Sequence, residues 1–152
     1  MEQALYLINL FFAGIGAGGL VMVQMVLIPL LNTYPDSESV HLHRQFDSRV
    51  DRYMPHSVIA SGVAAIVLLV VRHDFSTMAS ALRILGVLGS ASVAIISESR
   101  NKPINRTLKT WSADPVPAEY KMLRRTWDRF HALRTAAGVL AFVFYLAAVL
   151  AR

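Results

Sequence analysis

The chain has 152 residues, of which 55% are hydrophobic, and its formal net charge is +5. It has no cysteine, which excludes disulfides, thiolate nucleophiles and cysteine-ligated metal sites. So apolar a composition predicts membrane-spanning segments. In such a chain a basic excess indicates loops beside a membrane, with no nucleic acid as partner.

The apolar residues are gathered into four long segments. The first, residues 3–35, contains no Asp, Glu, Lys or Arg and exceeds the roughly 20 residues that cross a bilayer. It shows no polar stripe, which a soluble bundle would need. We expect helices at about 4–31, 55–72, 77–98 and 117–151, the last only partly in the membrane. The predicted fold is all-α, an integral membrane four-helix bundle forming one transmembrane domain, residues 1–152.

Two glycines in the first segment form a GxxxG pattern, Gly14 and Gly18. Glycines at this spacing allow two helices to approach closely. Packing within the bundle is one use of this face. Homo-oligomer formation through Gly14 and Gly18 is the other.

The loop between the first two spans has a helical pattern at residues 38–53. Leu42, Phe46 and Val50 recur every fourth residue, which predicts an amphipathic helix at the membrane interface. His43, Asp47 and Asp51 follow one another at intervals of one turn on another face. This row suits a metal ligand set or a proton relay, but the pattern favours a solvated face with Asp–Arg pairs. The metal alternative draws its further ligands from His41, His56 and His131.

Basic residues are concentrated in the loops after the first and third spans. These two loops share one side of the membrane and hold 12 of the 15 Lys and Arg residues. The positive-inside rule places the long loops in the cytoplasm and both termini outside. We expect an integral protein of a bacterial inner membrane or another plasma membrane.

The fourth segment carries Trp127, His131 and Arg134 on one helix face, since they are four and three residues apart. A histidine there can act as a general base, because its pKa is near neutrality and burial beside Arg134 lowers it. A histidine that only hydrogen bonds across the bundle is the plainer interpretation. Glu98, at the end of the third span, is the expected ion-pair partner of Arg134. Snorkelling of Arg134 to lipid phosphate is the alternative.

The stretch "NKPINRTL" places Asn101 and Asn105 on either side of Pro103. Their amides suit either a helix cap and turn or the orientation of a ligand. With the "W" and "WDRFHALRT" that follow, this stretch resembles the signature of the small anthrone-oxygenase-like membrane proteins. "HRQFDSRVDRYMP" is similar to an upstream stretch of many bacterial members, so the resemblance spans most of the chain. Arg100 departs from the pattern, because members often have a small residue there.

The resemblance implies an oxygenase or oxidase that converts aromatic, lipid-soluble anthrones to anthraquinones with O₂, using no metal and no organic cofactor. His131 would remove a carbon-bound proton, and the groups that hold the oxyanion would be those of Arg134, Asn101 and Asn105. The expected substrate-binding residues are Trp127, which would stack on a planar ring, Trp111 and His43.

The expected partners are therefore the lipid bilayer and a hydrophobic small molecule. One alternative remains from another class of protein. It is a non-catalytic membrane module that binds lipid, a quinone or a partner subunit through its basic cytoplasmic face.

Overall fold

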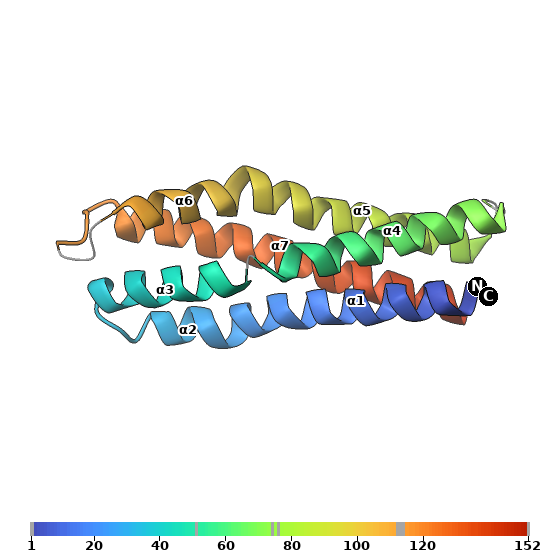
Figure 1. Ribbon diagram of the computed structural model, residues 1–152, viewed down its shortest axis with the longest axis horizontal. Coiled ribbons are helices and arrows are strands. Elements are labelled where there is room, and N and C mark those ends of the chain that lie inside the picture. The colour runs from blue at the N-terminus through green and yellow to red at the C-terminus, as the bar shows by residue number, and fades with distance from the viewer. Residues whose placement is uncertain (1, 51, 74, 76, 112–114, 152) are drawn as a thin grey trace.

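The computed structural model describes residues 2–50, 52–73, 75, 77–111 and 115–151, and within these ranges it contains helices and no strand. The elements, with η marking a π-helix, are α1 (Glu2–Met22), η1 (Val23–Leu27), α2 (Ile28–Leu31), α3 (Asp36–Val50), α4 (Met54–Arg72), α5 (Met78–Ile96), η2 (Ser97–Asn101), α6 (Lys102–Thr110) and α7 (Tyr120–Leu150). They form long rods that lie side by side, with both chain ends at one end of the bundle (Figure 1). The predicted all-α four-helix bundle is confirmed.

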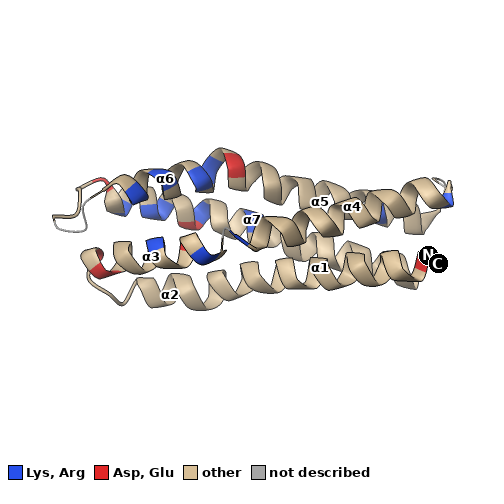
Figure 2. Cartoon of the chain, viewed as in Figure 1, with Lys and Arg blue, Asp and Glu red and all other residues tan. Residues whose placement is uncertain are grey.

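Four helical stretches are long and apolar enough to cross a membrane. They surround a common core, because α1 packs against α4 and α7, and α5 also packs against α4 and α7. Lys, Arg, Asp and Glu gather mainly in the half of the bundle that contains α3, α6 and the start of α7 (Figure 2). The other half is almost free of charge, as expected for the part of an integral membrane protein that lies in hydrocarbon.

Two of the rods change from α to π geometry for five residues, at η1 and at η2. A proline follows each π-segment at the start of the next helix, Pro29 after η1 and Pro103 after η2. Proline has no backbone N–H and cannot complete the ordinary helical hydrogen bond, so the turn before it widens. The helix predicted to end at about residue 98 therefore continues to Thr110. The prediction of a cap and a turn around Asn101 was wrong.

The loop between the first two spans does contain a helix, α3, but its inward face differs from the predicted one. Val40, His43 and Asp47 are buried, whereas Leu42, Phe46 and Val50, expected on the apolar face, are only half-buried. The interpretation of His43 and Asp47 as a solvated face was therefore wrong, and Asp51, the third member of that row, lies outside the described residues. Hydrogen bonds to α6 and α7 cause this orientation, because polar groups in a bundle require partners.

Close contact between α5 and α7 depends on glycine, but not on the GxxxG pair of α1. A Cβ at Gly86 would overlap the ring of buried Tyr145, and one at Gly89 would lie 2.9 Å from the Cβ of Ala141. Gly14 faces the ring of Phe142 at ordinary contact distance, and Gly18 has open space around it. The glycines that permit a close helix–helix contact between α5 and α7 are therefore those of α5.

Gly86→Ala should destabilise the protein by about 1–3 kcal/mol, because the added methyl group forces the Tyr145 ring out of its place. Gly18→Ala is the matched control, since nothing lies within 4 Å of its new Cβ. Thermal unfolding in detergent measures both variants. Equal melting temperatures for the two would contradict the packing described for α5 and α7.

Candidate functional site

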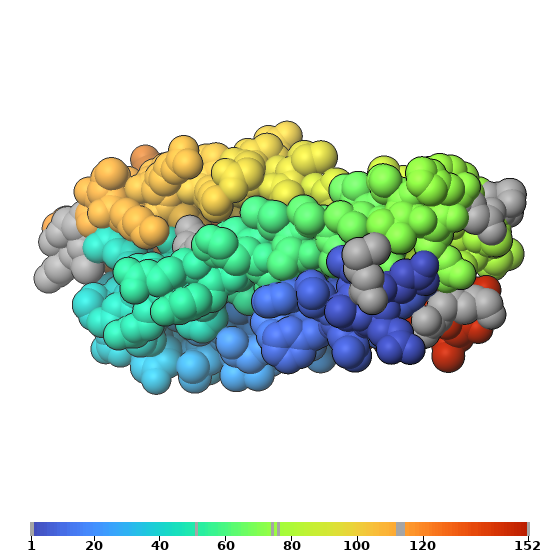
Figure 3. All heavy atoms as spheres, turned by 45° about the vertical axis from the view of Figure 1, so that its right-hand side comes forward, coloured from blue at the N-terminus to red at the C-terminus, as the bar shows by residue number. Residues whose placement is uncertain are grey.

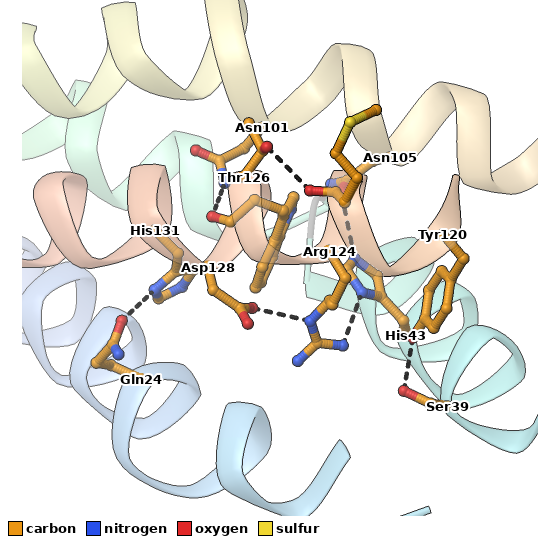
Figure 4. A network of polar contacts seen from close by, with 12 residues as sticks. Gln24, Ser39, His43, Asn101, Asn105, Tyr120, Arg124, Thr126, Asp128 and His131 are labelled. Carbon is orange, nitrogen blue, oxygen red and sulfur yellow. Dashed lines mark hydrogen bonds and ion pairs between the residues drawn. The ribbon is translucent and has the colours of Figure 1, made fainter. Parts of the chain in front are cut away.

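Buried polar side chains accumulate in the charged half of the bundle. They come from three parts of the chain that are distant in sequence: α3, the continuous helix formed by η2 and α6, and α7. The members are Ser39, His43, Asp47, Asn101, Asn105, Arg124, His131 and Thr135. Burial of so many polar groups is costly unless each is hydrogen bonded or serves a ligand. Figure 4 shows the hydrogen bonds and ion pairs that several of these side chains make, among them the series from Arg124 through His43 to Asn105.

Trp127 is the centre of this group and is only 4% exposed. The rings of His43 and His131 lie beside it, with centroids 4.6 and 4.9 Å from that of the indole. The guanidinium carbons of Arg124 and Arg134 lie 5.6 and 5.7 Å from the indole centroid. These contacts fix the indole in place as a wall of the site.

His43 is held by hydrogen bonds at both ring nitrogens. The Asn105 Nδ2 donates to a carboxylate oxygen of Asp47, which leaves the Asn105 Oδ1 to accept from His43 Nε2 at 3.3 Å. Lys109 Nζ lies 2.6 Å from the other Asp47 oxygen. On the opposite side, Arg124 Nη1 is 3.5 Å from His43 Nδ1, which accepts its hydrogen bond. His43 thus carries its proton on Nε2.

Burial strongly lowers the pKa of His43, from 6.5 to about 4, and the nearby Arg124 lowers it further. The group lies on α3, in the charged half and outside the uncharged segments that span the membrane. His43 is therefore neutral at physiological pH, which agrees with its position as an acceptor from a guanidinium.

His131 is fully buried and differs from His43 in having one unoccupied nitrogen. Its Nδ1 lies 3.2 Å from the Gln24 Oε1, an acceptor, so the ring proton is on Nδ1. The Thr135 hydroxyl donates to the His131 carbonyl at 2.8 Å. Within the described part of the chain, the His131 Nε2 has no hydrogen-bond partner. It keeps a lone pair that can accept a proton.

A cavity of about 130 Å³ lies against both histidines. Most of its wall is apolar and comes from α1, η1, α3, α4 and α5, including Leu20, Val23, Leu27, Phe46, Val58 and Val93. Its polar groups include His43, Asp47, Ser97, His131 and Arg134. An apolar cavity with a few convergent polar groups is typical of a small-molecule site.

A protein-family model described as anthrone oxygenase matches residues 43–144, which is about two thirds of the chain. This chain belongs to the anthrone oxygenase family. The match begins at His43 and includes the π-segment η2 and the buried face of α7. No curated protein and no solved structure matches the chain.

Both asparagines of the anthrone oxygenase motif are buried, and neither lines the cavity. Asn101 Nδ2 donates to the backbone carbonyl of Trp127 at 3.1 Å, which ties η2 to α7. Asn105 joins His43 to Asp47 as described above. Their amides therefore position the site residues, whereas contact with a substrate oxyanion was predicted for them.

The remaining predicted site residues are placed as follows. Glu98 forms an ion pair with Lys102 instead of Arg134, and Arg134 Nη1 donates to Ser97 Oγ at 3.2 Å. Trp111 does not line the cavity and instead packs against the apolar cluster to which Trp127 belongs. Among the described residues, no three His, Asp or Glu side chains are placed to hold a metal ion.

The residues that the sequence reasoning missed include Gln24, Arg124 and Lys109. Gln24 had a recognisable signal, because an amide within a long apolar helix requires a partner. Arg124 precedes Trp127 by three residues and so shares its helix face. Lys109 had no signal, since its partner Asp47 is 62 positions away in the sequence.

Stability should fall as the pH is lowered from 6.5 to about 4, because the unfolded chain then binds a proton at His43 and the folded chain does not. The loss attributable to this group is up to about 3 kcal/mol. Chemical unfolding across this pH range should give a shallower dependence for His43→Gln. His41→Gln, at an exposed histidine of the same helix, should keep the parental slope. A parental slope in His43→Gln would contradict its neutral, buried state.

Proposed function

We propose that this protein is a cofactor-independent oxygenase of lipid-soluble aromatic compounds, with anthrones as the substrate class. The observation that supports this most is the lone pair on His131 Nε2 beside a largely apolar cavity. Membership of the anthrone oxygenase family supports the same reaction. A base in an apolar site meets the two requirements of this chemistry, proton removal and exclusion of water.

The first step is transfer of a proton from the methylene carbon of the anthrone to His131 Nε2. The electron pair of the broken C–H bond is delocalised through the rings onto the ketone oxygen, which becomes an aryl oxide. Arg134 lines the same cavity, and its guanidinium supplies positive charge for this oxygen. Gln24 supports the step from the other side, because its amide oxygen stabilises the imidazolium that forms.

The aryl oxide then reacts with O₂. One electron passes to O₂, the two radicals combine to form a C–O bond, and the peroxide takes the proton back from His131. Loss of the second hydrogen from the same carbon, with cleavage of the O–O bond, forms the new C=O and releases water. Anthrone and O₂ thus give anthraquinone and water, and no other oxidant or reductant is consumed.

Purified protein in detergent or nanodiscs should consume O₂ when anthrone is added, as measured with an oxygen electrode. His131→Gln should lower the rate by about 10²–10⁴-fold, the usual contribution of a general base. His56→Gln is the control, because His56 is exposed and does not line the cavity. Normal turnover in a correctly folded His131→Gln protein would exclude His131 as the base.

The orientation in the membrane is part of the proposal. The charged half of the bundle, which contains the site, faces the cytoplasm, as the distribution of Lys and Arg favours (Figure 2).

The absence of cysteine allows a direct test, since an introduced cysteine is then the sole thiol. In intact cells a membrane-impermeant maleimide should label Phe75→Cys and leave Arg106→Cys unlabelled, because both sites are exposed but lie at opposite ends. Labelling of Arg106→Cys alone would mean the reverse orientation.

A further inference from the structure

The packing of α4 against α5 changes within one helical turn. At Gly62 the two helices are close, since an added Cβ would lie 3.9 Å from the Cβ of Ser90. One turn nearer the charged half, Ile59 of α4 and Ala94 of α5 both line the cavity instead. The two helices therefore separate where the cavity begins.

The exposed residues of the cavity wall mark where it opens. Most described lining residues are buried or half-buried, and those that are exposed are Ile59, Ala94 and Glu98. They belong to α4, α5 and η2, so the opening lies between these elements. Figure 3 shows this side of the molecule, with the green surface of α4 beside the yellow surface of α5 and η2.

The opening lies at the border between the apolar and the charged surface. On the side of the opening that is nearer the chain ends, α4 and α5 expose large apolar side chains, among them Val63, Ile66 and Leu88. On the side nearer the charged half, Glu98 and Lys102 form an exposed ion pair, and Lys102 also lines the cavity. Apolar surface of this kind faces lipid tails, and ion pairs lie at the headgroup level. The opening therefore faces the bilayer at the depth where tails meet headgroups.

We propose that this opening is a lateral portal through which an uncharged, planar aromatic ligand passes directly between the bilayer and the cavity. Ile59 and Ala94 form its apolar sides, and the Glu98–Lys102 ion pair forms the edge that is nearer the charged half. A ligand that enters here meets apolar wall first and reaches His131 and Arg134 with its leading polar group. The ligand class rests on the proposed function, whereas the route rests on the placement of the exposed lining residues.

The polarity of the route selects among ligands. A charged molecule in the bilayer is held at the headgroups and would have to lose its hydration to pass Ile59. An aromatic ketone has an apolar body that dissolves in the tails, and one oxygen that benefits from a positive partner inside. The portal thus favours compounds that are neutral in the membrane and become anionic only after His131 has taken a proton.

Binding kinetics of anthraquinone test the portal without requiring turnover. Protein with Trp111→Phe is placed in nanodiscs, so that Trp127, at the cavity wall, is the one tryptophan of the chain and can be excited selectively over tyrosine. Anthraquinone in the same bilayer quenches it by electron transfer, and stopped-flow mixing gives the association and dissociation rates.

The decisive substitution is Ala94→Phe, which narrows the portal. It should slow both rates by about tenfold, within the span over which association rates of related variants differ, and leave the Kd nearly unchanged. Ala91→Phe is the matched control, because Ala91 is an exposed alanine of the same helix that does not line the cavity. Its rates should remain within about twofold of the parent. The observed association rate should also rise with the mole fraction of anthraquinone in the bilayer, whereas the dissociation rate should not.

Three results would overturn the portal. These are equal rates in Ala94→Phe and Ala91→Phe, no quenching in the parent protein, and a loss of affinity in Ala94→Phe with an unchanged association rate. Failure of the proposed oxygenase reaction has a different signature. In that case anthraquinone still binds with slowed rates in Ala94→Phe, but the parent protein consumes no O₂ with anthrone.

Discussion

The hydrogen bond between Asn105 and Asp47 is the interaction on which the charged half of the bundle depends. A carboxylate buried in a helical bundle is unstable without partners, and here an amide and the Lys109 ammonium supply them. Because Asp47 faces inward, its neighbour one turn earlier, His43, faces inward too and reaches Trp127. Without this interaction, α3 could lie on the membrane surface as its apolar residues suggested, and the cavity would lose one wall.

The two buried histidines show how environment divides chemical roles between identical side chains. His43 has partners on both ring nitrogens, so it is neutral and has no lone pair available for a substrate. Among the residues that the structure describes, His131 has hydrogen-bond partners at Nδ1 and none at Nε2, and the acceptor at Nδ1 fixes the tautomer that leaves a lone pair on Nε2. The same division, with one group constrained and its neighbour available, underlies acid–base assignments at many active sites.

The membrane bundle could be predicted from the sequence because uncharged segments longer than a bilayer have few other structures. The shared face of Trp127, His131 and Arg134 followed from helical periodicity, which is local. The roles of Asn101 and Asn105 did not follow, because their partners lie on α3 and α7, distant in sequence. The ion pair of Glu98 with Lys102 was missed for a local reason. The helix was expected to end at about residue 98, but it continues through Pro103, which places Lys102 one turn after Glu98.

The π-segment η2 changes which residues of its rod face inward. In a continuous α-helix, seven residues make nearly two turns, so the buried position after Val93 would be Arg100. The wider turn moves that position by one residue, and the fully buried residue is Asn101, while Arg100 lies outside with its guanidinium over Phe130. An arginine next to the family motif is therefore compatible with a buried amide network. If one residue between Val93 and Asn101 were lost, Asn101 would itself be the seventh residue after Val93, and an ordinary α-helix would keep it buried. The π-turn is thus what accommodates one additional residue in this helix without removing Asn101 from the core.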